Sequence, residues 1–177
     1  MPINLPENQH FEESEISETF INYRTNEGRV VEASIEKKGN NQAFAYTLKV
    51  TLEKNKQSIT KKRSISAYEY IDYKQQAIPG MKQLKAQRIC TMQDGLYMVI
   101  DYFPGIEGQP MICIIQLDEA KLAEMSKRIQ LPEYLEIESE ITDQPEYQPI
   151  ALAKKPEHLS SLNVLAAVED EEEKKSN

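Results

Sequence analysis

Short segments in which apolar and polar side chains alternate fill much of the chain, and this pattern constrains the fold more than any other feature. Residues 46–51 and 84–89 show it most clearly, and residues 59–63 form a further strand-like segment that is rich in charge. Such alternation predicts strands with one apolar and one polar face. In many of these segments the polar positions hold lysine, threonine or acidic residues. These side chains can therefore face something other than solvent. A barrel can turn a polar face inward around a ligand, and we expect that arrangement here.

The order of the patterns predicts a mostly antiparallel chain. The expected strands are 15–21, 29–38, 43–52, 57–65, 82–92, 96–103, 111–117 and 134–141. A capping-box pattern at Ser66 and Glu69 predicts a helix over 67–76, and Asp118 can cap a second helix over 119–129. A further helix can lie within 156–168. The predicted fold is therefore α+β: an antiparallel β-barrel of about eight strands with helices packed outside.

The period of two also assigns faces to the strands. Val31, Ala33, Ile35, Leu48 and Val50 share the apolar side of their strands, which we expect to face an outer core. The polar set on the opposite side of the same strands is then turned toward the interior of the barrel.

Composition limits the partners that the chain can have. The formal net charge is −8, and the last nine residues hold five acidic residues and two lysines. An acidic surface argues against binding to nucleic acid or to an anionic membrane, because both need a basic footprint. No apolar run reaches the roughly 18 residues that a membrane span needs, and the start of the chain lacks the pattern of a signal peptide. We therefore expect a cytoplasmic protein.

The chain divides into three parts. We expect a flexible lead-in over 1–12, one barrel domain over 13–150, and a C-terminal segment over 151–177 whose acidic end is disordered. Cys90 and Cys113 both lie in apolar, strand-like surroundings, and the chain has no Cys-x-x-Cys pair and no cysteine–histidine cluster. Free buried thiols are therefore favoured over a disulfide or a metal site.

Three motifs, in this order of elements, are similar to those of a known family. Residues 63–70 carry an Ile-Ser pair followed by a helix with a glutamate. Residues 85–90 and 94–103 combine a Lys-Ala-Gln-Arg strand with a strand that ends in Asp-Tyr-Phe, and residues 134–147 contain Leu-Glu-Ile, Glu-Ile-Thr, a proline and a tyrosine. Over 13–150 the chain resembles the CYTH domain, also called the triphosphate tunnel metalloenzyme fold. The last motif most resembles the CYTH-like domain of the TRPL translocation defect protein group.

This resemblance implies a ligand site inside the barrel. Members of the superfamily hold a triphosphate there with lysine and arginine side chains, and carboxylates at the tunnel mouth hold Mg²⁺ or Mn²⁺, which can activate water. Carried over to this chain, the phosphate-binding residues are Lys49, Lys62 and Lys85. The implied metal ligands are Glu15, Asp101 and Asp118.

Other positions depart from the family pattern. The two arginines of the second strand fall on Ser34 and Glu36, which removes two positive charges and adds a negative one. The Lys-x-Arg strand becomes Lys85-x-Gln87, and Arg88 lies one position over, where alternation predicts that it faces outward. We therefore expect strongly weakened triphosphate binding and little or no triphosphatase activity.

Three functions follow from these residues. The one we favour is a degenerate CYTH-like protein that binds a phosphorylated small molecule or nucleotide without hydrolysing it. The alternative is a Mg²⁺- or Mn²⁺-dependent phosphohydrolase that acts on phosphoanhydride bonds of an altered substrate. The third is a scaffold whose acidic tail recruits a basic partner. The structural interpretations stay open beside these, since strand lysines are commonly solvated and Asp118 can cap a helix without a metal.

Overall fold

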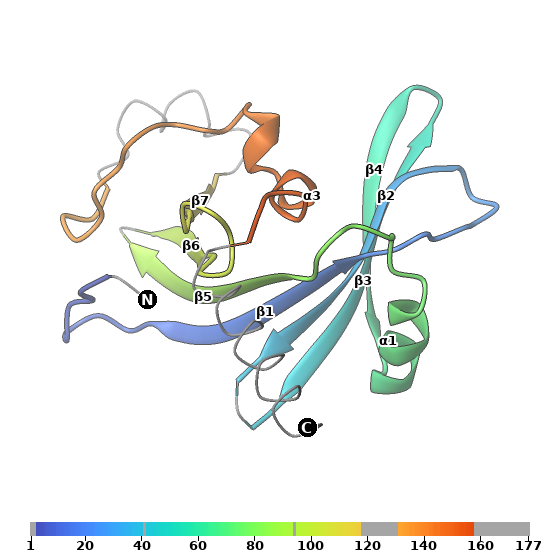
Figure 1. Cartoon of the computed structure of the whole chain (residues 1–177). Coiled ribbons are helices and arrows are strands. Elements are labelled where there is room, and N and C mark those ends of the chain that lie inside the picture. Colours follow the sequence, from blue (N-terminus) through green and yellow to red (C-terminus); the bar gives the residue numbers. More distant parts are fainter. Residues whose placement is uncertain (1–2, 41, 94, 118–130, 158–177) are drawn as a thin grey trace, which may run out of the picture.

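One antiparallel sheet of seven strands forms the body of the molecule in the computed structural model, which describes residues 3–40, 42–93, 95–117 and 131–157. The strands are β1 (Glu12–Phe20), β2 (Arg29–Gly39), β3 (Phe44–Lys54), β4 (Gln57–Ile65), β5 (Leu84–Gln93), β6 (Leu96–Tyr102) and β7 (Met111–Gln116). Their order across the sheet is β4-β3-β2-β1-β5-β6-β7. The sheet is strongly curled into a half-barrel (Figure 1). The predicted antiparallel, barrel-like fold is thus confirmed, with seven described strands.

Short polar turns make the first four strands a meander. In the turn between β3 and β4, Asn55 and Lys56 both have positive φ angles, of 53° and 63°, which is the conformation of a tight two-residue hairpin. The pairing of β2 with β3 shifts between Val30 and Glu32, so Val31 is an extra residue outside the ladder. Val31 is 53% exposed, and the prediction that it lies on the apolar face is wrong for this reason.

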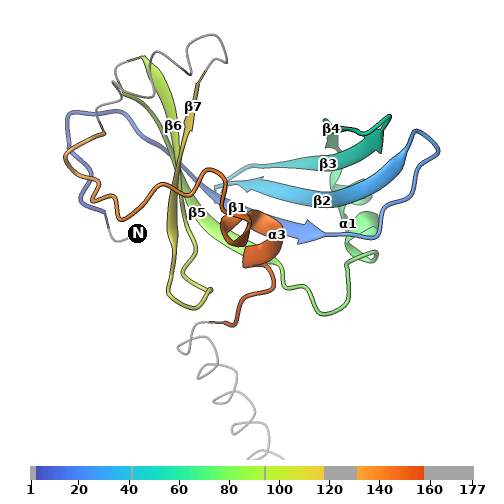
Figure 2. The ribbon, with the colours of Figure 1, turned by 90° about the horizontal axis from the view of Figure 1, so that it is seen from above.

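The outer face of the sheet packs against α1 (Ala67–Lys74). Tyr70 of α1 lies in one core cluster with apolar residues of β2, β3 and β4, namely Ala33, Ile35, Leu48, Val50, Leu52 and Ile65, and with Ile21. Each fully buried Ile or Leu side chain contributes about 1.5–3 kcal/mol, so this cluster fixes the helix against the sheet (Figure 2). Apart from Val31, the predicted outer apolar set is confirmed.

A capping box starts α1. The backbone amide of Glu69 donates to Oγ of Ser66 at 3.2 Å, and the amide of Ser66 donates to Oε2 of Glu69 at 2.8 Å. Nη1 of Arg63 lies 2.9 Å from Oε1 of Glu69. The backbone hydrogen bond from Ser66, followed by the contact with Arg63, lowers the pKa of Glu69. The predicted helix is confirmed over its described bounds, because these contacts satisfy amides that a helix start leaves unpaired.

Replacing Ser66 by alanine should lower the free energy of unfolding by about 1 kcal/mol, because the Glu69 amide loses its acceptor. Urea unfolding followed by circular dichroism would measure this change. Ser58→Ala, at an exposed position of β4, is the matched control and should change stability by less than about 0.5 kcal/mol. Equal effects of the two substitutions would contradict the role of the cap.

The inner face of the sheet, opposite α1, is apolar over β1 and β5. Ile16, Phe20, Leu84 and Ala86 pack there against the end of α3 (Pro149–Leu152), which follows a short 3-10 turn, η1 (Pro145–Tyr147). Leu152 and Ala153 are both fully buried in this cluster. Figure 1 shows α3 inside the curl of the sheet, with α1 on the other side. Leu152 and Ala153 therefore belong to the packed core, and α3 is a helix that the sequence patterns did not predict.

The predicted closing strand over 134–141 is not formed: these residues have irregular backbone outside the sheet. Alternation of Glu136, Glu138 and Glu140 with apolar residues suits an exposed extended segment as well as a paired strand, so the pattern overpredicted pairing. The predicted helix over 119–129, its cap Asp118, and the residues from 158 onward lie outside the described residues. None of the described helices has the length and hydropathy to cross a membrane.

Candidate functional site

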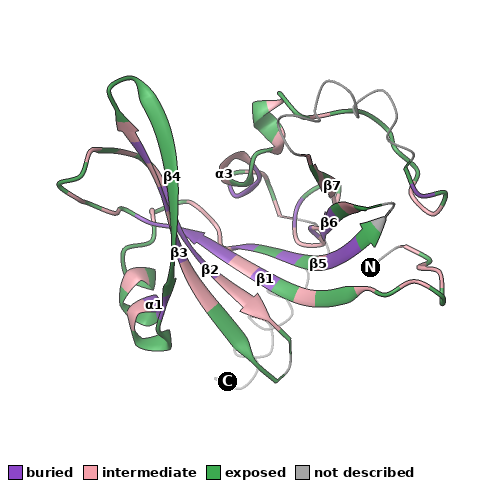
Figure 3. Ribbon diagram, turned by 180° about the vertical axis from the view of Figure 1, so that it is seen from behind, coloured by how far each residue is buried: buried purple, intermediate pink, exposed green. Residues whose placement is uncertain are grey.

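Polar side chains cover the inner face of β2, β3 and β4. The strand register decides which residues share this face, because side chains that are paired across strands lie on the same side. We call this set the inner wall; it comprises Glu18, Glu32, Ser34, Glu36, Thr47, Lys49, Thr51, Thr60, Lys62 and Ser64. Exposure rises along the wall from the buried Glu18 on β1 to the exposed residues of β4 (Figure 3). A ligand would therefore reach it from the β4 side.

An ion-pair network lies at the centre of the inner wall. Nζ of Lys49 donates to Oε2 of Glu36 at 2.7 Å and to Oε1 of Glu18 at 3.4 Å. Oγ of Ser34 donates to the same Glu18 oxygen at 2.6 Å. The side chains of Glu18 and Glu36 are only 10% and 11% exposed. Three adjacent strands are thus connected by one ammonium group that two buried carboxylates neutralise.

The charges in this network shift two pKa values. Burial favours the neutral form of Lys49, but the attraction of Glu18 and Glu36 and their hydrogen bonds outweigh it and raise the pKa of Lys49. Lys49 therefore stays protonated at neutral pH and is unsuited to act as a general base or nucleophile. Burial, and then repulsion by Glu18, raises the pKa of Glu32, while Lys49 opposes this rise. Glu32 is thus a carboxylate whose charge the fold disfavours.

A second ion pair connects β5 and β6 on the same face. Arg88 donates from Nε and Nη2 to the two oxygens of Asp101, both at 2.7 Å. Burial opposes the charge of Arg88, but the hydrogen bonds and attraction of Asp101, with a contribution from Glu36, raise its pKa. The prediction that Arg88 faces outward is wrong. The register pairs Arg88 with Asp101 and places Ala86, not Lys85, on the inner face.

Three of the predicted site residues share one face of the sheet, although Asp101 is on β6 and the two lysines are on β3 and β4. Lys49, Lys62 and Asp101 lie on the inner face. Lys85 and Glu15 lie on the opposite face, because Lys85 pairs with Ser17 and Glu15 with Gln87, and both are exposed. The prediction that Lys85 and Glu15 point into one cavity with Lys49, Lys62 and Asp101 is therefore wrong. Asp118 lies outside the described residues.

The same register reveals charged residues that the sequence patterns missed. Glu18, Glu32 and Arg88 are on the inner face, and Glu36 is there as a carboxylate partner of Lys49. Alternation with Ala33 and Ile35 already turns Glu32 and Glu36 inward, whereas the only sequence signal for Glu18 and Arg88 is the apolar Ile16 and Ala86, which mark the inward positions of β1 and β5. That signal could not be used without knowing that α3 covers these positions.

Comparison with known proteins identifies the architecture. No protein-family profile and no curated protein matches the sequence. Two solved structures of NE1496 do match, one described as a hypothetical protein and the other as an inorganic triphosphatase. Each has a TM-score of 0.57 and 15% sequence identity, covering 87% of this chain and 94% of the other. The chain has the CYTH-like fold. The likeness lies in the fold, and the finer resemblance to the TRPL group remains a prediction.

A CYTH-like fold implies a divalent metal, but the described carboxylates do not fit one. Glu15 and Asp101 lie on opposite faces of the sheet, and both oxygens of Asp101 are engaged by Arg88. The described residues contain no group of three or more His, Cys, Asp or Glu side chains arranged to hold a metal ion. We therefore assign no chemical step to Mg²⁺ or Mn²⁺ in this part of the chain.

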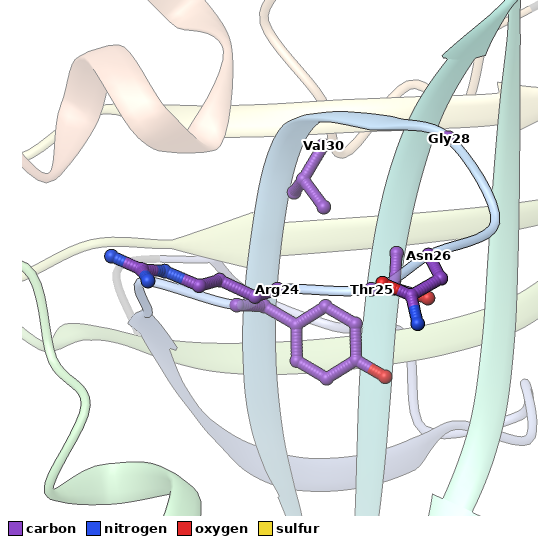
Figure 4. Close-up of a pocket in the computed structure, with 6 residues that line it drawn as sticks. Arg24, Thr25, Asn26, Gly28 and Val30 are labelled. Carbon is purple, nitrogen blue, oxygen red and sulfur yellow. The ribbon is translucent and has the colours of Figure 1, made fainter.

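A hollow on the surface of this CYTH-like structure lies elsewhere. It is an open depression of about 660 Å³ at the loop between β1 and β2. Its lining residues are Tyr23, Arg24, Thr25, Asn26, Gly28 and Val30. Figure 4 shows Arg24 extending away from Thr25 and Asn26, so the polar groups do not converge on one point. We place the candidate site on the inner wall instead, because charged side chains with defined partners converge there.

Proposed function

We propose that this protein binds a phosphorylated small molecule or nucleotide on the inner wall of its CYTH-like fold, with little or no triphosphatase activity. The observation that carries the proposal is the 2.7 Å contact between Lys49 and Glu36. Glu36 lies at the position where the family resemblance places an arginine. Its carboxylate binds the ammonium group of Lys49, to which a phosphate would otherwise bind. A ligand with several negative charges would have to displace it.

The charge balance of the inner wall supports a weakly charged ligand. The wall carries the cations Lys49 and Lys62 against the anions Glu18, Glu32 and Glu36. A tripolyphosphate with about four negative charges needs several converging cations, and this set does not offer a positive surplus. A single phosphate group can instead use Lys62, which is exposed and has no ion pair among the described residues, together with the nearby threonine hydroxyls.

The structural neighbour described as an inorganic triphosphatase is consistent with a phosphorylated ligand, and the absence of converging described metal ligands argues against retained hydrolysis. A metal-dependent phosphohydrolase would need acidic ligands from the part of the chain outside the described residues. We therefore treat phosphohydrolase activity as an outcome of the test rather than as a second proposal.

Two assays on the purified protein test this function. We expect no phosphate release from tripolyphosphate or ATP with Mg²⁺ or Mn²⁺. We expect ethyl phosphate or AMP to raise the melting temperature, because a ligand at 100 times its Kd adds about 2.7 kcal/mol of stability. Rapid phosphate release would show that the protein is an active phosphohydrolase, and no stabilisation by any phosphorylated compound would overturn the proposal.

A matched pair of substitutions locates the binding. Lys62→Ala on the inner wall should weaken phosphate binding by about tenfold, because it removes one charge-assisted hydrogen bond. Lys85→Ala, at another exposed lysine on the opposite face, should leave binding unchanged. Equal losses in both variants would show that phosphate binds through general surface charge and not on the inner wall.

A further inference from the structure

We infer that the inner wall selects phosphorylated amines, compounds that carry an ammonium group close to a single phosphate. The inference rests on the proposed function and names the class of ligand. It comes from the way in which negative and positive side chains are arranged on β2, β3 and β4, with opposite charges on neighbouring positions of one polar surface.

The register places three rows of polar residues side by side, of which Glu36, Thr47 and Ser64 form the first. Ser34, Lys49 and Lys62 form the middle row. Glu32, Thr51 and Thr60 form the row beside it. Neighbouring strands are about 4.8 Å apart, and successive residues on one face of a strand are about 6.7 Å apart. A carboxylate, two hydroxyl groups and two ammonium groups therefore lie within the reach of one small molecule.

The carboxylate end of this arrangement is Glu32. It is half-buried beside the bulge at Val31, and no ion pair within the described residues involves it. Burial and repulsion by Glu18 raise its pKa, and Lys49, which opposes this rise, forms its ion pairs with Glu36 and Glu18 instead. A cationic group of a ligand placed beside Glu32 would relieve both the repulsion and the unpaired charge.

The phosphate end is formed by Lys62 and the paired hydroxyls of Thr51 and Thr60. The two hydroxyl oxygens are 3.0 Å apart, and the pair lies between Glu32 and the exposed edge of the sheet. Lys62 is directly opposite Lys49, so a phosphate group there would also reduce the repulsion between two ammonium groups. Hydroxyl and ammonium donors together supply the hydrogen bonds that phosphate oxygens accept.

The charge balance of the wall favours a ligand that contacts the carboxylate end and the phosphate end at the same time. A phosphate alone brings negative charge toward Glu32, Glu18 and Glu36, and each of these repels it over a few ångströms. An ammonium group on the same molecule turns the interaction with Glu32 from repulsion into attraction. The wall should therefore discriminate between two compounds that carry the same phosphate group, one with an amine and one without it.

Isothermal titration of the whole protein without added metal tests this inference with three probes: O-phosphoethanolamine, ethyl phosphate and ethanolamine. We expect O-phosphoethanolamine to bind about tenfold more tightly than ethyl phosphate at pH 7, because it adds one charge-assisted contact. In Glu32→Gln that advantage should disappear. In Glu15→Gln, which removes an exposed carboxylate from the opposite face, it should persist.

The outcomes separate this inference from the proposed function. Equal affinities for O-phosphoethanolamine and ethyl phosphate, or a preference that survives Glu32→Gln, would overturn the inference while leaving phosphate binding intact. Ethanolamine binding as tightly as O-phosphoethanolamine would overturn it as well, since the phosphate would then contribute nothing. If neither phosphate compound binds, the proposed function itself fails. A melting curve of Glu32→Gln confirms that the variant is folded.

Discussion

Replacing Lys49 by methionine should lower the free energy of unfolding by about 2–4 kcal/mol, because it leaves two buried carboxylates facing each other without a cation. Lys49 is 24% exposed, and Glu18 and Glu36 are 10% and 11% exposed, so water screens the resulting repulsion poorly. Urea unfolding at pH 7 would measure the loss. Adding Glu36→Gln to Lys49→Met should restore part of it, since the second change removes one of the repelling charges.

Lys62→Met is the matched control for this experiment. Lys62 is opposite Lys49 on β4 but is exposed, so its loss should change stability by less than about 0.5 kcal/mol. The pH dependence has a defined sign. Because the pKa of Lys49 is raised in the folded state, its stabilisation is complete below the usual lysine pKa of about 10.4 and is lost as the pH rises through the folded-state value. Equal effects at positions 49 and 62 would contradict the network.

Glu36→Arg should strengthen the binding of tripolyphosphate by about 10- to 100-fold. The substitution removes the carboxylate that occupies Nζ of Lys49 and adds a guanidinium group, and each charge-assisted hydrogen bond contributes about 1.5–3 kcal/mol. Position 36 suits this test better than position 34, since Ser34 is 2% exposed and an arginine there would overpack the interior. Isothermal titration without metal would measure the gain.

Glu15→Arg carries the same change of charge on the opposite, exposed face and serves as the control. Its effect on tripolyphosphate affinity should be small, because exposed charges are screened by salt beyond about 10 Å. An equal gain in both variants would show that net charge alone governs binding. No gain in Glu36→Arg would show that position 36 does not contact the ligand.

The sequence predicted local structure well where a single local pattern determines it, namely a helix cap or the alternation of apolar and polar residues. The capping residues Ser66 and Glu69 fix the start of α1, and the alternation of Ala33, Ile35 and Leu48 with polar residues fixes the faces of β2 and β3. In these places the signal lies within a few residues of its effect. A turn and a cap depend mainly on local backbone chemistry, so nearby residues carry most of the signal.

Which side chains of β1 and β5 point toward the inner face could not be predicted in this way. The expectation of a polar interior along the whole sheet put Glu15 and Lys85 inside, but the inner face there is apolar because Leu152 and Ala153 cover it. The segment that sets the direction of these strands thus lies more than fifty residues beyond β5. On β5, polar residues also occupy neighbouring positions, Gln87 and Arg88, so alternation alone does not decide which one faces inward.

Strand β4 has a consequence for the behaviour of the protein at high concentration. It lies at the end of the strand order with β3 as its described neighbour, and residues 57–64 are exposed. An unpaired strand edge is a template on which another molecule can add a strand. Lys61 and Arg63 form ion pairs with Glu27 and Glu69, so a second copy that approached edge to edge would meet the charge of Lys62, which is uncompensated among the described residues. The same lysine that we propose as a phosphate contact therefore also helps to keep the protein from self-association, and neutralising it would favour aggregation.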